Sequence, residues 1–89
     1  MKITAEMIPL IRHCRRLNQS EFAEYVGIPQ ARLSEIETKK IPISEHYLDK
    51  LFLAIGKLKF TKNELQQIEE LVKVSKQTKL KGGFKNEEL

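Results

Sequence analysis

The side chains able to do chemistry are distributed unevenly: the reactive ones are scattered, whereas hydrogen-bonding ones gather in one short window. His13 and His46 are far apart, and neither has metal-ligand spacing around it. Cys14 is the single cysteine, which excludes an internal disulfide and is insufficient for a thiolate zinc site. Residues 30–35, QARLSE, instead combine an amide, a guanidinium, a hydroxyl and a carboxylate. Such groups recognise the edges of planar polar partners. We therefore expect recognition chemistry, with no enzymatic activity, no cofactor and no metal.

Size and composition limit the chain to one domain. It has 89 residues, of which 40% are hydrophobic and 31% charged, as expected of a globular protein with a modest core. No apolar run approaches a membrane span, and the first residues lack the pattern of a signal peptide. One cysteine fits a reducing cytoplasm. The net charge of +4 suits a polyanionic partner but does not establish one.

Apolar residues recur at helical spacing, so the predicted fold class is all-α. The first helix carries the stripe Met7, Ile8, Leu10, Ile11, Cys14 and Leu17, with Cys14 expected to be a small buried hydrophobe. Thr4 is a possible N-cap. Because Pro9 fits poorly inside a helix that starts so early, we place the start near Met7.

The second and third helices form a close pair. Asn18 and Glu21 have the spacing of a capping box, which predicts a helix starting at Gln19. That helix ends before Gly27, where a positive φ is expected. The third helix runs from about Gln30 to Thr38. The pair has the layout of a helix-turn-helix, which presents its second helix to the major groove of DNA.

Two further helices complete the five. Ser44 is placed to cap a fourth helix that reaches Gly56 through the apolar positions Leu48, Leu51, Phe52 and Ile55. Thr61 and Glu64 repeat the capping-box spacing and predict a fifth helix extending to about Lys79. The tail from residue 81, KGGFKNEEL, is expected to be disordered.

This layout resembles the lambda-repressor/Cro type, also called the XRE family of helix-turn-helix proteins. The segment NQSEFAEYVGIPQARLSEIE carries the resemblance, which covers about residues 8–56. It implies a compact five-helix DNA-binding domain, an ion pair between Arg12 and Glu37, and a phosphate contact by Gln19. The chain departs from the family at Pro29, where Ser or Thr usually caps, and at Lys39, where Gly is usual. The loop after the third helix is therefore expected to differ.

A helical wheel selects the candidate base-reading residues. Leu33 and Ile36 face the core, so the opposite face points outward. The predicted readers near the exposed N-terminal side of this helix are Gln30, Ala31, Arg32, Ser34 and Glu35. Gln30 is suited to adenine, Ala31 to a thymine methyl and Glu35 to a cytosine amine. Arg32 suits either guanine or a phosphate.

Candidate phosphate contacts lie at helix starts and on nearby cations. They are Gln19, Lys39, Lys40 and Ser44. Arg15 and Arg16 could equally bind phosphate or complement the helix dipole.

The chain is predicted to divide into a DNA-binding domain at 1–58, a C-terminal helix at 59–80 and a tail at 81–89. One face of that helix carries Leu65, Ile68, Leu71 and Val72, which either form a homodimer interface or cover the chain's own core. A homodimer would read a near-palindromic operator.

The leading hypothesis is a sequence-specific transcriptional regulator, a repressor of phage or mobile-element type that acts on double-stranded DNA in the bacterial cytoplasm, at the nucleoid. An antitoxin or controller protein shares this architecture and would bind a protein partner through the C-terminal helix. A protein-interaction module that does not bind DNA is the third alternative.

Overall fold

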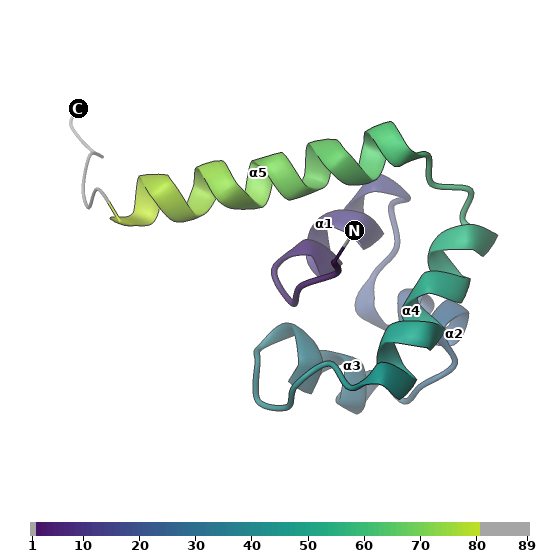
Figure 1. The fold of residues 1–89 in the computed structure, drawn as a ribbon. Coiled ribbons are helices and arrows are strands. Elements are labelled where there is room, and N and C mark those ends of the chain that lie inside the picture. Colours follow the sequence, from purple (N-terminus) through teal and green to yellow (C-terminus); the bar gives the residue numbers. More distant parts are fainter. Residues whose placement is uncertain (1, 81–89) are drawn as a thin grey trace.

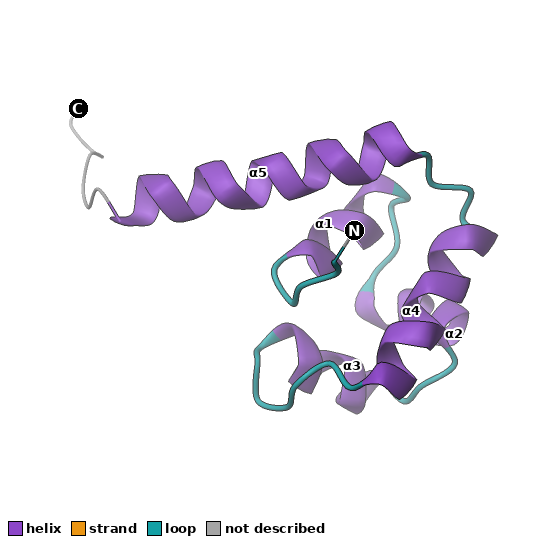
Figure 2. Cartoon of the chain, in the orientation of Figure 1, coloured by secondary structure: helices purple, strands orange, loops and turns teal. Residues whose placement is uncertain are grey.

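The computed structural model describes the backbone of residues 2–80 and the side chains of residues 2–75. The described backbone consists of helices and connecting loops, without a strand, which confirms the all-α prediction (Figures 1 and 2). The five helices, joined by short loops, are α1 (Met7–Cys14), α2 (Gln19–Val26), α3 (Gln30–Glu37), α4 (Glu45–Lys57) and α5 (Lys62–Leu80). The predicted tail at 81–89 lies outside the described residues.

Three of the helices begin at side-chain caps that the sequence predicts. The Asn18 side chain accepts the Glu21 amide at 2.7 Å, and the Glu21 carboxylate accepts the Asn18 amide at 2.9 Å. Ser44 caps α4 by accepting from the Tyr47 amide at 3.3 Å. Thr61 and Glu64 form the reciprocal pair at the start of α5, at 2.9 and 3.1 Å. These caps satisfy amides that lack a partner within the helix.

The start of α1 follows a different rule. The helix begins at Met7, so Pro9 falls in the first turn, where its missing N–H would have no helical partner in any case. The hydroxyl of Thr4 makes no cap. Its Oγ1 is buried without a hydrogen-bond partner in the described chain.

Each of the four shorter helices is followed by a residue in the left-handed conformation. Gly27 has φ of 83°, as predicted, and the other three are Arg16 at 57°, Lys39 at 66° and Lys59 at 59°. At each, the next amide reaches back to close the helix end, for example Lys40 to the Glu35 carbonyl at 2.8 Å. The loop after α3 therefore keeps the positive φ that glycine usually supplies, and the expectation that Lys39 changes this loop is wrong.

One core joins all five helices. Its fully buried side chains are Met7, Ile8, Ile11, Phe22, Leu33, Ile36 and Leu51. α2 packs on both α3 and α4, while α1 packs on α5. The prediction that Cys14 is buried is wrong: Cys14 is exposed because it ends α1. Phe52, one of the apolar positions named for the fourth helix, is 41% exposed.

α5 lies across α1 with its first half and continues past the other helices with its second (Figure 1). Ile68 and Val72 are 2% and 9% exposed, and Leu65 packs against the same core. These three residues complete the chain's own core. Leu71 is 56% exposed because its position on the helix is rotated about 80° from the centre of that buried face.

Candidate nucleic-acid interface

The turn between α2 and α3 determines which side of α3 faces solvent. Gly27 ends α2, Ile28 packs partly against the core, and Pro29 precedes α3 in extended backbone. Leu33 and Ile36 are then fully buried against α2 and its neighbours. The opposite face of α3 is left at the surface of the molecule, at the end remote from α5 (Figure 1).

The predicted base-reading residues lie on that outer face. Gln30, Ala31 and Arg32 are exposed, whereas Ser34 and Glu35 are half-buried. The structure therefore brings all five together along two turns of one helix. Thr38 ends the row, with its hydroxyl donating to the Ser34 carbonyl at 2.9 Å.

Arg32 and Glu35, which the sequence analysis treated separately, form an ion pair. Arg32 Nη1 lies 2.8 Å from Glu35 Oε1, and the two side chains are 47% and 41% exposed. Exposed pairs of this kind contribute less than about 1 kcal/mol, so either partner can exchange it for a base or a phosphate. The pair also offsets a negative charge that would otherwise repel DNA.

A network of four side chains supports the start of α3. Arg12 donates to both carboxylate oxygens of Glu37, at 2.9 and 3.1 Å, which confirms the ion pair implied by the family resemblance. Gln19 Nε2 donates to Glu37 Oε1 at 3.0 Å, and Gln30 Nε2 approaches Gln19 Oε1 at 3.5 Å. Glu37 is only 6% exposed, so its charge depends on these donors. Through them, α1 and α2 fix the position of the first exposed side chain of α3.

The candidate phosphate contacts differ in whether another side chain of the protein already binds them. Lys40 is exposed and has no partner among the described side chains, and Ser44 is exposed at the start of α4. The Lys39 ammonium instead forms an ion pair with Glu6. Gln19 has its amide engaged in the network described above. A phosphate would therefore compete with Glu6 for Lys39 and with Glu37 for Gln19, but would meet Lys40 unopposed.

Arg15 has a structural role that sequence reasoning missed. Its guanidinium donates to Glu64 at 2.9 and 3.0 Å and to the Leu58 carbonyl at 2.9 Å, and it lies 3.9 Å from the centre of the Phe60 ring. The Arg15 hydrogen bonds and the Thr61 amide lower the pKa of Glu64 to about 2. These partners are more than 40 positions away in sequence, so no local pattern signals them. Arg15 therefore fastens α5 to α1 and is not available to DNA.

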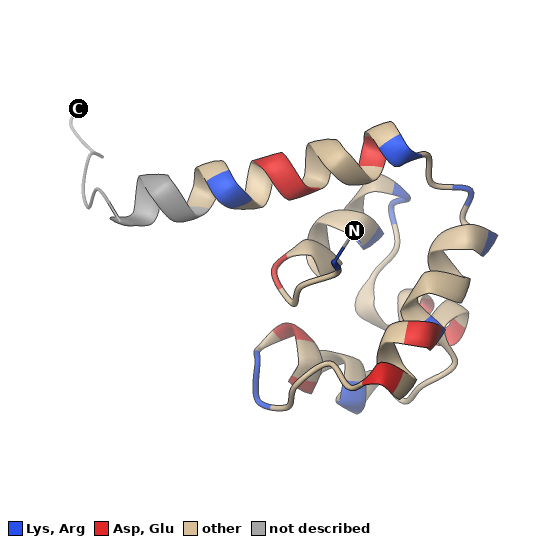
Figure 3. Ribbon diagram, viewed as in Figure 1, with Lys and Arg blue, Asp and Glu red and all other residues tan. Residues whose placement is uncertain are grey.

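Charge at the α3 end of the molecule is mixed. Figure 3 shows basic segments in α3 and in the loop that follows it, next to acidic segments of α3 and α4. Attraction to a polyanion therefore depends on particular cations, above all Lys40 and Arg32, and not on a uniformly basic face.

The match to known protein families shows the class of protein to which this fold belongs. Residues 11–63, which span α1 to the start of α5, match the helix-turn-helix family. The chain belongs to this family. It is a helix-turn-helix protein of the XRE, or lambda-repressor/Cro-like, type, and the family is one of double-stranded DNA-binding transcription regulators. Comparison with curated proteins and with solved structures gave no match.

The described part of this helix-turn-helix protein contains neither a metal-binding cluster nor a membrane-spanning helix. Among the described residues, no three His, Cys, Asp or Glu side chains gather where they could hold a metal ion. None of the described helices has the length and apolar character needed to cross a membrane.

Proposed function

We propose that this protein is a sequence-specific transcriptional regulator, a repressor of phage or mobile-element type, that reads the major groove with α3. The observation that supports this most is the row of exposed side chains on α3, above all Gln30, supported by the network of Arg12, Glu37 and Gln19. A glutamine held in position can pair with adenine through two hydrogen bonds at little further loss of conformational freedom.

The other readers add to this assignment. Ala31 offers a methyl group to thymine, and Glu35 accepts from the amine of cytosine once Arg32 turns to a phosphate or a guanine. Phosphates on either side of the groove would bind Lys40 and the capped start of α4 at Ser44. In this assignment residues 1–58 read DNA.

We further propose that the protein acts as a homodimer through residues 59–80. The second half of α5 extends past the other helices, and the described chain places no element beside it (Figure 1). Leu71 and Val74 are 56% and 55% exposed there, next to the exposed Gln67. An unsupported helical segment this short is marginal in water, so a partner helix is expected to stabilise it.

The charges along α5 specify how a second copy would pack. Its first half contains Glu64, Glu69 and Glu70 with Lys62 at its start, a net charge of −2 (one positive and three negative), and its second half contains Lys73, Lys76 and Lys79. Two antiparallel copies place acidic halves against basic halves, whereas parallel copies place like charges together. Positions 67, 71 and 74 follow the four-and-three spacing of a helix–helix seam. Of the four residues predicted for dimerisation, only Leu71 is therefore proposed to lie in the interface.

Selection from a random DNA library tests this function. Purified protein is mixed with random duplexes at near-physiological salt, and the bound duplexes are sequenced. An enriched inverted repeat, with half-sites about one helical turn or about 34 Å apart, is the expected result. An enriched single half-site would contradict the dimer but would still support base reading by α3. No enrichment would contradict base reading and favour an antitoxin, a controller protein that needs a partner on α5, or an interaction module.

A further inference from the structure

A groove on the side of the molecule away from the base-reading residues has no role in the function proposed above. It lies between the segment that precedes α1 and the loop that joins α3 to α4. Its volume is about 500 Å³, within the usual range of small-molecule sites. Its lining consists of residues 2–6, Lys39, residues 41–43 and Leu48.

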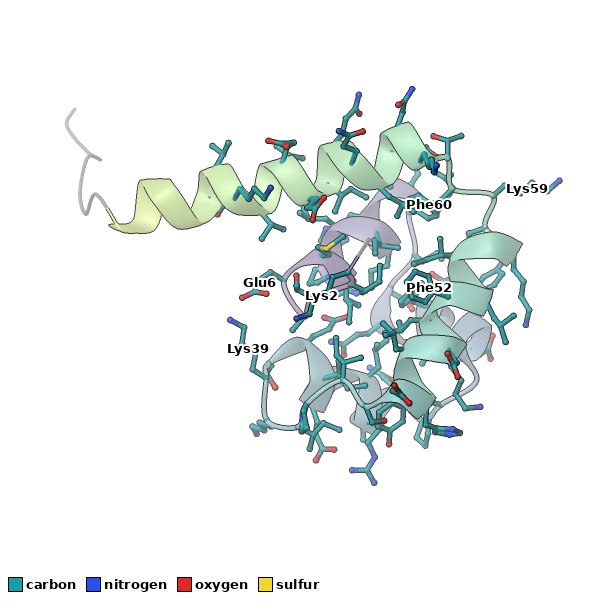
Figure 4. The ribbon with its side chains drawn as sticks, in the orientation of Figure 1. Lys2, Glu6, Lys39, Phe52, Lys59 and Phe60 are labelled. Carbon is teal, nitrogen blue, oxygen red and sulfur yellow. The ribbon has the colours of Figure 1, made fainter. Side chains whose placement is uncertain are left out.

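The floor of this groove is aliphatic. Ile3 is 3% exposed, and Ile41, Ile43 and Leu48 are partly buried around it. Phe52 extends the apolar surface by one turn of α4 beyond Leu48, and Figure 4 shows it on the side of α4 that faces α1. Contiguous apolar surface of this kind favours a ligand with a hydrocarbon body.

The rim of the groove carries a net positive charge. Lys2 is exposed, and the Lys39 side chain is 62% exposed, with its ammonium paired to Glu6. Figure 4 shows Lys39 and Glu6 pointing toward one another across the mouth of the groove, with Lys2 beside them. Two ammonium groups and one carboxylate leave one positive charge for a ligand.

The wall of the groove contains one polar atom that has no partner. Thr4 Oγ1 is buried and makes no hydrogen bond in the described chain. A buried polar atom left in this state destabilises a protein by about 1–3 kcal/mol. A small movement of the segment before α1 would allow this hydroxyl to donate to an anionic oxygen.

We propose that this groove binds a small amphipathic carboxylate, with the hydrocarbon body on the aliphatic floor and the carboxylate between Lys2 and Lys39. Most of the lining residues lie in irregular segments, and the described chain contains no strand, so it offers no sheet edge to which a peptide could add. A small molecule therefore fits better than an extended peptide. The readers Gln30, Arg32 and Glu35 do not line the groove, so the carboxylate would share only the candidate phosphate contact Lys39 with DNA.

Titration with octanoate, followed by amide chemical shifts, tests the site in the full chain without DNA, so its outcome does not depend on the proposed function. Octanoate is kept below the concentration at which it forms micelles. Two control compounds separate the contributions: acetate has the carboxylate without the long hydrocarbon chain, and 1-octanol has the hydrocarbon chain without the charge. We expect saturable shifts at residues 3–6 and 39–43 with octanoate, and much weaker binding of both controls.

Two variants make the test specific. Lys39→Gln is expected to weaken octanoate binding about fivefold, because it removes one of the two ammonium groups at the rim of the groove. Lys59→Gln is the matched control, since Lys59 also has a positive φ and is exposed, but lies far from the groove (Figure 4). The proposal is overturned if octanoate shifts other residues, if 1-octanol or acetate binds equally well, or if both variants behave alike.

Discussion

At the residue scale, the interface depends on hydrogen bonds between side chains from three helices. Gln30 is exposed and could adopt many conformations, but its amide contacts Gln19 at 3.5 Å, and Gln19 is in turn held by Glu37. Arg12 donates to both carboxylate oxygens of Glu37 and fixes their position, although Glu37 is almost buried. The stability of the helix packing and the position of a reader are therefore coupled through one carboxylate.

Replacing Arg12 by methionine tests that coupling. Arg12→Met leaves the nearly buried Glu37 without its cation, and we expect a loss of about 3 kcal/mol in the free energy of unfolding, measured with urea. Arg32→Met is the matched control because it breaks an exposed Arg–Glu pair, and should change stability by less than about 1 kcal/mol. Equal losses in the two variants would contradict the network.

Some of these side-chain contacts could be predicted from the sequence. The family resemblance implied the pair of Arg12 and Glu37, and the helical wheel predicted that Leu33 faces the core. The Arg32–Glu35 pair was within reach of sequence reasoning, since its partners are three residues apart on one helix. The partners of Arg15 were not, because they depend on where α5 returns along α1.

At the element scale, the helices are defined by their ends more than by their interiors. Polar caps start α2, α4 and α5, and left-handed residues follow the shorter four. Spacing rules predicted the caps well because a cap and its target lie three residues apart. The left-handed conformations of Arg16 and Lys59 were not predicted, since long cations are ordinary helix formers and carry no such signal, whereas Lys39 stood out because the family usually has glycine there.

These left-handed cations predict a stabilising substitution. Lys59→Gly should raise the free energy of unfolding by about 1 kcal/mol, because glycine adopts a positive φ without the clash that Cβ causes. Lys73→Gly is the control, since an exposed glycine within α5 should lower stability by about 1 kcal/mol. Urea denaturation of both variants measures these changes in the free energy of unfolding. Destabilisation by Lys59→Gly would show that the lysine side chain matters more than its backbone conformation.

The ion pair that attaches α5 to α1 predicts that the stability of the folded chain depends on pH. The pKa of Glu64 is about 2 in the folded chain, against an ordinary value of 4.5. Because the folded pKa is lowered, the ion pair with Arg15 stabilises fully above pH 4.5, and its contribution is lost as the pH falls from 4.5 towards 2. Glu64→Gln should therefore lower Tm at pH 7 and do so much less at pH 2.5.

Glutamine at position 64 can still cap the Thr61 amide, so this variant isolates the charge. Glu70→Gln, exposed on the same helix, serves as the control and should change Tm little at either pH. A Tm difference for Glu64→Gln that is independent of pH would mean that the charge on Glu64 does not fasten α5.

At the scale of the whole molecule, the chain has the proposed DNA-reading helix α3 at one end and a projecting helix, α5, at the opposite end (Figure 1). The sequence predicted five helices and their order, because periodicity and caps are local. It did not decide whether the apolar face of α5 turned inward or outward. That depends on where α1 lies, and the structure divides the face into buried Ile68 and Val72 and exposed Leu71.

The exposed part of α5 predicts self-association. Leu71→Glu should convert the dimer to a monomer, measured by sedimentation at micromolar concentration, because it places a charge in the seam. Leu53→Glu is the matched control: Leu53 is 66% exposed on α4, away from α5, and its replacement should leave the dimer intact. A wild-type protein that sediments as a monomer at every concentration would contradict the dimer.

The most direct test of the account is whether α3 reads bases through Gln30. Every base pair of the selected site is replaced in turn, and the affinities of wild-type protein and of Gln30→Ala are compared. Gln66→Ala, an exposed glutamine on α5, is the control. We predict that Gln30→Ala loses about 1–3 kcal/mol on the preferred site and no longer discriminates at one base pair, while Gln66→Ala keeps the wild-type preference. An unchanged base preference in Gln30→Ala would contradict α3 as the reader.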